Sequence, residues 1–247
     1  MAKQPGKRVA LVTGGAKRVG RAIVERLADS GQFDVAFTYY HSGTLADDLS
    51  RKYENGPARV VRIPANLDDP STFVPAVAHD FQRSFDRLDV LVHNASAYEP
   101  SGLEQTNLEQ IRRFNAVHLE SPLLLTQALA QMLRASRGHV ITMVDLLAER
   151  PWPQYLAYCT SKAALANLTL GLARALAPEC TVNGIAPGVV EWPDDYPEED
   201  KQRYLRRVPL ARAGTPQDVS NLVHFLVTEG TYIHGQIIRV DGGRSIT

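Results

Sequence analysis

The stretch VALVTGGAKRVG, residues 9–20, decides the fold. Its first five residues form a continuous β-type run, which is typical of a strand buried on both faces. A glycine-rich turn follows, and apolar residues then recur every four positions at Val19, Ile23 and Leu27, which predicts a helix. In a doubly wound sheet, this strand–turn–helix unit places a pyrophosphate on the helix N-terminus.

The rest of the chain repeats the same unit. Six further strands are predicted over residues 34–40, 59–63, 88–93, 139–144, 181–185 and 236–240. Helical patterns are predicted between them, the clearest over residues 71–85, 103–134, 156–176 and 216–229. This alternation predicts an α/β fold, a doubly wound seven-stranded parallel sheet with helices on both faces (a Rossmann fold), in a single domain over residues 1–247.

Composition excludes several classes of protein. Of 247 residues, 44% are hydrophobic and 22% are charged, which is ordinary globular usage and excludes a disordered chain. Lys+Arg and Asp+Glu both number 27, so no net charge favours nucleic acid or an anionic membrane. Two cysteines are too few for a disulfide framework or a structural zinc site. We therefore expect a cytoplasmic protein without a membrane segment, metal or nucleic-acid partner.

The turn carries two adjacent cations, Lys17 and Arg18, and Arg18 stands where a common dinucleotide fingerprint has its middle glycine. Gly14 permits the tight turn, and Gly20 allows the helix to pack close to the strand. Cations at a helix N-terminus oppose the helix dipole, which favours an anion beside them. The alternative is two solvated basic residues.

The end of the second strand indicates which dinucleotide binds. An acidic residue there would bind the ribose hydroxyls and repel a 2′-phosphate, but Tyr40, His41 and Ser42 offer no carboxylate. Arg18, His41 and Ser42 could together hold a 2′-phosphate. The sequence therefore favours NADPH.

A candidate catalytic pair opens the helix over residues 156–176. Tyr158 and Lys162 are four residues apart and share one face of that helix. A free tyrosine has a pKa of about 10, and a neighbouring ammonium lowers that value by stabilising the phenolate. The pair is therefore a candidate general acid.

Together these motifs resemble the short-chain dehydrogenase/reductase family along essentially the whole chain. The landmarks, in order, are Thr13–Gly20, His93–Ser96, Tyr158 with Lys162, Asn183–Gly188 and Asp241–Gly243. The resemblance implies a seven-stranded Rossmann fold, usually as a homotetramer. It also implies hydride transfer from a nicotinamide, with Tyr158 donating the proton and Lys162 holding the ribose and the tyrosine.

One departure from the family narrows the chemistry. Asp145 stands where the family usually has a serine, thirteen residues before Tyr158. A carboxyl group can relay a proton to an imine nitrogen or pair with an amidine-like edge. An ionised Asp145 would raise the pKa of Tyr158, so the two groups must share a hydrogen bond or a proton. The alternative is a serine lost in a defunct enzyme.

Asp145, Arg18 and the Asn94-Ala95-Ser96 motif together resemble the pteridine reductase branch, which includes the bacterial dihydromonapterin reductases with their dihydrofolate reductase activity. In that branch an aromatic residue stacks the pterin against the nicotinamide, and Tyr98 falls at that place. Ordinary loop packing is the other interpretation of Tyr98. The resemblance implies substrate binding by Arg18, Ser96, Tyr98, Asp145, Tyr158 and Gly188.

By the same resemblance, the cofactor is bound by residues from every loop at one edge of the sheet. These are Gly14, Lys17, Arg18, Val19, Tyr40, His41, Ser42, Asn66, Leu67, Asn94, Ala95, Ser96, Tyr158, Lys162, Pro187, Gly188 and Val189. Asn66 replaces an acidic residue that often contacts the adenine, and its amide can still bond to the base.

Three further positions bear on the site. The irregular acidic stretch Glu191–Tyr204 is either a solvated loop or part of a substrate lid over residues 189–210. His118 replaces an asparagine that continues a proton relay in the family, and we expect its role to be auxiliary. Arg212 is expected to be structural.

The leading hypothesis is an NADPH-dependent reductase that converts a dihydropterin (dihydromonapterin, dihydrobiopterin or dihydrofolate) to its tetrahydro form, with Asp145, Tyr158 and Lys162 as catalytic residues. The alternative enzyme is a carbonyl reductase, such as one acting on a 3-oxoacyl thioester. A third hypothesis is a redox-sensing nucleotide-binding protein without catalysis, but such proteins tend to lose the Tyr/Lys pair that this chain keeps.

Overall fold

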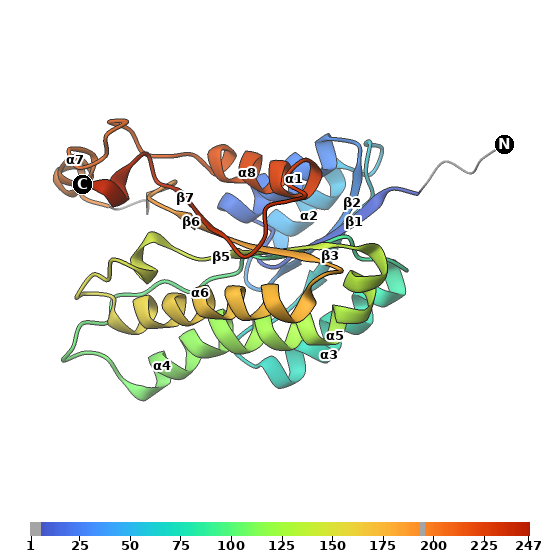
Figure 1. Ribbon diagram of the computed structural model, residues 1–247, viewed down its shortest axis with the longest axis horizontal. Coiled ribbons are helices and arrows are strands. Elements are labelled where there is room, and N and C mark those ends of the chain that lie inside the picture. Colours follow the sequence, from blue (N-terminus) through green and yellow to red (C-terminus); the bar gives the residue numbers. More distant parts are fainter. Residues whose placement is uncertain (1–5, 193–195) are drawn as a thin grey trace.

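Seven strands form one parallel sheet in the computed structural model, which describes residues 6–192 and 196–247 (Figure 1). The sheet order is β3-β2-β1-β4-β5-β6-β7. The strands are β1 (Arg8–Val12), β2 (Phe33–Tyr39), β3 (Val60–Pro64), β4 (Val90–His93), β5 (His139–Met143), β6 (Thr181–Pro187) and β7 (Ile237–Val240). The predicted doubly wound fold is confirmed. Because the order reverses between β1 and β4, a crevice opens at the carboxyl ends of these two strands.

Helices cover both faces of the sheet (Figure 1). One face carries α1 (Arg18–Asp29), α2 (Gly43–Lys52) and α8 (Pro216–Thr228). The other carries α3 (Pro70–Ser84), α4 (Leu108–Asn115), α5 (Ser121–Ser136) and α6 (Leu156–Leu176). None of the helices in the described part of the chain combines the length and apolar character needed to cross a membrane.

The first strand shows why the sheet is buried on both sides. Successive side chains of a strand point to opposite faces. Val9 and Leu11 accordingly pack in the core beneath α3, α5 and α6, whereas Ala10 and Val12 pack in the core beneath α1, α2 and α8. Each buried Val or Leu side chain contributes about 1.5–3 kcal/mol. The continuous apolar run therefore fixes this strand in the centre of the sheet.

The region over residues 103–134 differs from the prediction. Helix α4 begins only at Leu108, because Asn107 caps it and forms a capping box with Gln110. A π-helix, Ala116–Glu120, then joins α4 to α5. The region thus holds two α-helices, within the prediction of one or two, but the first begins later than Leu103 because local capping determines where it starts.

The predicted irregular stretch Glu191–Tyr204 contains a helix, α7 (Glu198–Leu205). Acidic residues occupy its first turn, where they complement the helix dipole, and Lys201 pairs with Glu198. The interpretation of the whole stretch as a loop was therefore wrong. Residues 193–195 of the predicted lid lie outside the described residues.

Arg212 has the expected structural contact. Its Nη1 lies 2.9 Å from Oδ2 of Asp218. That carboxylate also accepts from the backbone of Thr215 and completes the capping box of α8. Arg212 thus ties the segment before α8 to the start of that helix.

Candidate active site

The glycine turn after β1 is packed against backbone. Gly14 has φ +66°, and a Cβ there would lie 2.9 Å from Ala95 Cα. A Cβ at Gly20 would lie 2.1 Å from the carbonyl oxygen of Gly14. Asn94 holds the turn because its Nδ2 donates to the carbonyls of Thr13 and Gly14, each at 3.0 Å. Gly20 therefore permits contact with the turn itself rather than with the strand.

The start of α1 offers backbone N–H groups to an anion. Lys17 occupies the N-cap without a side-chain capping bond, and the first turn holds no acidic residue. Arg18 adopts φ 52°, the left-handed region, which explains why a glycine commonly stands here. Its Nε lies 3.5 Å from Oε2 of Glu191. These features fit a pyrophosphate, which the uncapped N–H groups would bind.

The end of β2 presents exposed polar rings. The Tyr40 and His41 rings contact each other with centroids 3.8 Å apart, and Ser42 is the N-cap of α2. Within the described residues no hydrogen bond or ion pair joins Arg18 to His41 or Ser42. The structure therefore connects Arg18 to Glu191 and does not bring the predicted 2′-phosphate set together by direct contact.

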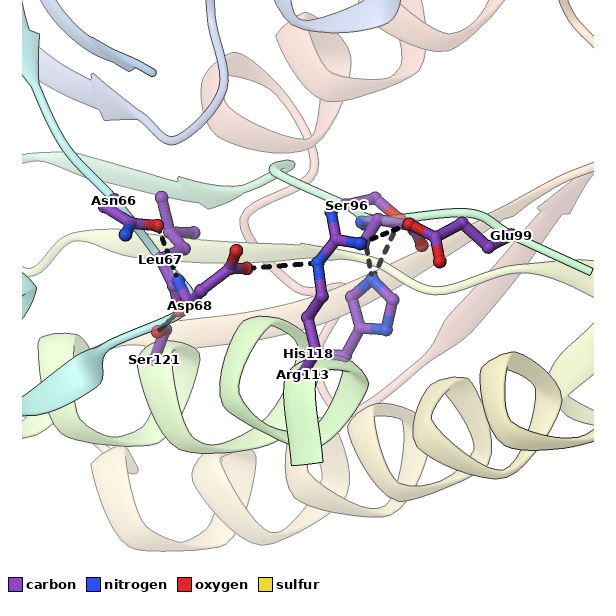
Figure 2. A network of polar contacts seen from close by, with 9 residues as sticks. Asn66, Leu67, Asp68, Ser96, Glu99, Arg113, His118 and Ser121 are labelled. Carbon is purple, nitrogen blue, oxygen red and sulfur yellow. Dashed lines mark hydrogen bonds and ion pairs between the residues drawn. The ribbon is translucent and has the colours of Figure 1, made fainter. Parts of the chain in front are cut away.

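A polar network fixes the loops after β3 and β4 (Figure 2). Arg113 pairs with Asp68, at 3.5 Å from Nε to Oδ1, and also with Glu99. Asn66 accepts a hydrogen bond from the Asp68 backbone, and the Leu67 carbonyl accepts one from Ser121. The predicted adenine-binding residues thus sit on a loop that is tied to α4 and α5.

The three predicted catalytic side chains meet beyond the end of β5. Tyr158 Oη donates to Asp145 Oδ2 at 2.6 Å, and Asp145 Oδ1 accepts the Leu147 backbone N–H at 2.8 Å. Lys162 lies on the same face of α6, with Nζ 5.7 Å from the Tyr158 ring centroid. Its Nζ donates to the Met143 carbonyl at 2.8 Å. The predicted coupling between Asp145 and Tyr158 is confirmed.

Burial controls the protonation of this cluster. Desolvation raises the pKa of Asp145, partly offset by the Leu147 N–H, Tyr158 and Lys162. Desolvation, followed by the nearby Asp145 charge, raises the pKa of Tyr158 well above its usual value. Desolvation lowers the pKa of Lys162 to about 8. The pKa of Tyr158 therefore shifts upward, opposite to the lowering expected from Lys162, because burial and Asp145 dominate.

His118 is fully buried within the π-helix and bonded on both ring nitrogens, and Figure 2 shows the contacts of one of them on the Ser96 side. The Ala97 backbone N–H donates to Nε2 at 3.3 Å, so the ring proton resides on Nδ1. Nδ1 then donates to Ser161 Oγ at 2.8 Å, and Ser161 donates to the Tyr158 carbonyl at 2.7 Å. Burial lowers the pKa of His118 well below its usual value, so the ring is neutral.

Beside the catalytic cluster lies a pocket of about 300 Å³. It is lined by Arg18, Tyr98, Asp145, Leu146, Leu147, Arg150, Trp152, Tyr155, Tyr158, Gly188, Val189, Val190, Glu191, Trp192, Tyr196, Tyr204 and Arg244. Of the six predicted substrate-binding residues, five line this pocket, and Ser96 does not. Its hydroxyl lies 2.9 Å from His118 Nε2 instead.

Aromatic rings form a continuous wall along this pocket. Tyr158 meets Tyr98 edge-on at 4.9 Å, and Tyr98 stacks on Tyr155 at 4.6 Å and 14°. Trp152 follows, 6.2 Å from Tyr155 and 6.3 Å from Tyr204. We call these five rings the aromatic wall. Only Tyr98 and Tyr158 were predicted as site residues.

The missed residues come from segments far apart in the sequence. The aromatic-rich run PWPQY, residues 151–155, was the only local signal for Trp152 and Tyr155. Tyr204 belongs to α7, and Arg244 follows the Asp241–Gly243 landmark. No group of three or more metal-ligating side chains occurs within residues 6–192 and 196–247.

A Rossmann sheet with a glycine turn at its crevice and a buried Asp–Tyr–Lys cluster beside a pocket defines a nicotinamide-dependent oxidoreductase. The family model described as enoyl-(acyl carrier protein) reductase matches residues 14–245. The chain belongs to the short-chain dehydrogenase/reductase family.

Curated relatives fall into two groups at similar identity. Pteridine reductase 1 of Leishmania tarentolae is 32% identical over 100% of this chain and 99% of its own length. The dihydromonapterin reductase of Escherichia coli is 31% identical over 96% of each chain. The 3-oxoacyl-[acyl-carrier-protein] reductase of Aquifex aeolicus is 32% identical over 98% of each chain. Overall identity therefore supports a reductase of this family without separating the two substrate classes.

Solved structures agree with the fold. A short-chain dehydrogenase/reductase from Serratia marcescens superposes with a TM-score of 0.90 at 31% identity, covering 98% of this chain and 100% of its own. A metagenomic blue fluorescent protein in complex with NADPH superposes with a TM-score of 0.88 at 31% identity, covering 96% of this chain and 98% of its own.

Proposed function

We propose that this protein catalyses the NADPH-dependent reduction of a dihydropterin to the tetrahydro form. The observation that carries the proposal is the 2.6 Å hydrogen bond between Tyr158 Oη and Asp145 Oδ2. A carbonyl substrate needs one hydroxyl donor at its oxygen. An imine nitrogen in a ring needs a proton from an acid beside it, and burial raises the pKa of the Asp145 carboxyl group, which favours that role.

The chain's own residues deliver the proton. When NADPH is bound, its nicotinamide supplies the hydride to the ring carbon of the C=N bond. The Leu147 N–H orients the Asp145 carboxyl group, and burial favours its protonated form. Asp145 and Tyr158 together hold the proton that passes to the adjacent ring nitrogen. The charge of Lys162 limits how far the pKa of Asp145 rises.

The pocket suits a flat heterocycle. One face of Tyr98 is covered by Tyr155, so a ligand ring stacks on the opposite face or edge. Asp145 at the pocket wall can accept from the amino edge of a pterin in the same plane. The aromatic wall adds apolar area that a planar bicyclic ring covers well.

The proposed cofactor is NADPH. Support comes from the residues after β2, Tyr40 to Ser42, which carry no carboxylate to repel a 2′-phosphate. The cation Arg18 lies at the start of α1, where a phosphate binds. One superposed relative also carries NADPH.

A 3-oxoacyl thioester reductase is the second candidate. It is favoured by the 32% identity to the acyl carrier protein reductase, which equals that to the pteridine reductase. Asp145 weighs against it, because a carboxylate hydrogen-bonded to Tyr158 competes with a carbonyl oxygen for the phenolic proton.

The experiment is NADPH oxidation measured in parallel with dihydromonapterin, dihydrobiopterin and dihydrofolate, and with acetoacetyl thioester. NADH replaces NADPH in a matched series. We expect turnover of at least one dihydropterin, with NADPH preferred. Thioester reduction without pterin turnover would establish the second candidate.

A further inference from the structure

Arg244 is a buried cation on the wall of the substrate pocket. Its side chain lies in the short 3-10 helix η3 (Arg244–Ile246), and only 8% of the residue is exposed. Among the described residues, no hydrogen-bond acceptor reaches its Nε, which is fully buried. A guanidinium group stays charged at every accessible pH, so burial cannot neutralise it. Arg244 thus lines the pocket with a charged group whose buried Nε has no acceptor among the described residues.

The nearest carboxylate in sequence is already occupied. Oδ1 of Asp241 accepts the Gly243 N–H at 2.9 Å, and Oδ2 accepts the Ser245 N–H at 2.7 Å. These bonds shape the turn into η3. The contact that Arg244 does make is with an aromatic face, since its Cζ lies 5.5 Å from the Tyr204 ring centroid. Such a contact holds the guanidinium in place and leaves its N–H groups available.

The other two arginines of the pocket are in different situations. Arg18 lies 3.5 Å from the Glu191 carboxylate, and both side chains are substantially exposed. Arg150 is exposed, and its Nη1 donates to the Thr247 main-chain oxygen at 3.2 Å. Arg244 is thus the arginine of this pocket that combines burial with an unused donor in the described structure.

Arg244 contacts the aromatic wall at Tyr204. The aromatic wall runs from Tyr158 through Tyr98, Tyr155 and Trp152 to Tyr204, and Arg244 contacts the last of these rings. A substituent that extends along this wall from a ring beside Tyr158 would lead to Arg244.

We propose that the pocket selects substrates whose substituent ends in a carboxylate or phosphate, and that Arg244 binds this group. The planar fork of the guanidinium matches both anions. The inference rests on the proposed function for the identity of the ring. For a dihydropterin, it means a preference for an anionic substituent at C6 over a neutral one. For an acyl thioester, the same anion would be a phosphate of the carrier.

Binding can be measured without turnover, because both tryptophans of the chain, Trp152 and Trp192, line this pocket. The probes are pterin-6-carboxylate, neutral 6-hydroxymethylpterin and acetoacetyl-coenzyme A, titrated by tryptophan fluorescence with NADP⁺ present. We expect Arg244→Gln to raise the dissociation constant of pterin-6-carboxylate by about 10- to 100-fold, which is the usual effect of losing one hydrogen bond to a charged group. Binding of 6-hydroxymethylpterin is expected to change less than about 3-fold, well below one charged bond.

Two controls make the result specific. Arg239→Gln removes an exposed cation of β7 that pairs with Glu149, and it is expected to leave every dissociation constant unchanged. Arg244→Lys keeps the charge and is expected to retain part of the anion preference. Thermal melting of each variant shows that it is folded.

Each outcome separates the two proposals. If both pterins bind and Arg244→Gln raises their dissociation constants equally, the anion site is refuted, while the proposal of a pterin substrate is retained. If neither pterin binds but the coenzyme A thioester binds in an Arg244-dependent way, the anion site stands and the pterin assignment fails. Full retention of pterin-6-carboxylate affinity in a folded Arg244→Gln variant would overturn the inference outright.

Discussion

Tyr158 and Asp145 form one proton-holding unit: the phenol donates to the carboxylate across 2.6 Å, with Tyr158 buried and Asp145 at the wall of the pocket. Burial raises the pKa of both groups, and Asp145 raises that of Tyr158 further, whereas the hydrogen bond from Tyr158 lowers the pKa of Asp145. The unit therefore titrates as a pair, and its protons belong to both residues. Replacing one member changes the protonation of the other.

Asp145→Ser restores the residue that the family usually has. We expect it to lower kcat for dihydropterin by about 100-fold or more, because general acid catalysis contributes about 10²- to 10⁴-fold. Steady-state assays of NADPH oxidation with the preferred dihydropterin measure this change in kcat. Asp145→Asn is the matched control, since it keeps the shape but cannot release a proton. An undiminished rate in both variants would remove Asp145 from the mechanism.

Burial of Lys162 makes the free energy of unfolding depend on pH. Its pKa falls from the ordinary 10.5 to about 8, so between these values the unfolded chain binds more protons than the native protein. Stability then rises with pH across that range. Relative to Lys162→Met, the cofactor-free wild type should gain about 3 kcal/mol between pH 8 and pH 10.5. Urea denaturation of both proteins at each pH checks this, and parallel curves would refute it.

Arg18 has a strained backbone conformation, and its side chain is expected to bind a cofactor phosphate. At φ 52° a non-glycine residue costs about 1–2 kcal/mol, so Arg18→Gly is expected to stabilise the cofactor-free protein by about 1 kcal/mol. The same change removes a cation at the start of α1 and should raise KM for NADPH more than KM for NADH. Calorimetry and steady-state kinetics measure the two effects. Arg18→Lys keeps both charge and strain, and a loss of stability in Arg18→Gly would contradict the argument.

Tyr98 is predicted to stack on the substrate ring. Tyr98→Leu should raise KM for dihydropterin by about 5- to 100-fold, as stacking of a base on an aromatic ring contributes about 1–3 kcal/mol. Tyr98→Phe keeps the ring and should behave as wild type. Because Tyr98 also packs on Tyr155, melting temperatures accompany the kinetics. Equal KM values for the Tyr98→Leu and Tyr98→Phe variants would show that Tyr98 only packs within the loop and does not stack on the substrate.

His118 is expected to remain neutral with its proton on Nδ1 throughout the pH range of activity. Burial, with the Lys162 charge as a smaller contribution, lowers its pKa well below the usual value. Nitrogen chemical shifts of ¹⁵N-labelled histidine between pH 5 and pH 8 report both the tautomer and the charge. A titration step at His118 in that range would show that the ring exchanges protons during turnover.

The sequence predicted the fold because strand burial and helix periodicity are local patterns. The apolar run before Thr13 and the four-residue spacing after Gly20 need no long-range information. The coupling of Asp145 to Tyr158 was accessible only through the family resemblance, which puts Asp145 where the family usually has a serine close to the tyrosine. Local spacing was sufficient for the fold but not for this contact.

The direction of the Tyr158 pKa was missed because desolvation depends on the packed structure. Spacing shows that Lys162 is near, but not that its Nζ bonds to Met143 and that the cluster is buried. The left-handed backbone of Arg18 was missed for a similar reason. Arginine has no preference for that region, so only the tertiary contacts of the turn impose it.

Trp152, Tyr155 and Arg244 could not be predicted from local patterns, and Tyr204 was expected only as part of the lid over residues 189–210. They come from the segment before α6, from α7 and from η3, which only the folded topology brings together. Single tryptophans and arginines in loops carry no periodic signal. The helix α7 was missed because its acidic, proline-flanked composition is shared with solvated loops.

The π-helix at Ala116–Glu120 has a consequence for how α4 faces its neighbours. A π turn contains one residue more than an α turn, and each residue of an α-helix rotates the chain by about 100°. The extra residue therefore sets the angular phase of α4 against α5. With this phase, Arg113 on α4 reaches both Asp68 and Glu99, while His118 faces Ser96 (Figure 2). Deleting one residue of this π turn would rotate α4 about its axis by about 100°. Arg113 would then point away from Asp68 and Glu99, and the loops that carry these two residues would lose their contact with α4.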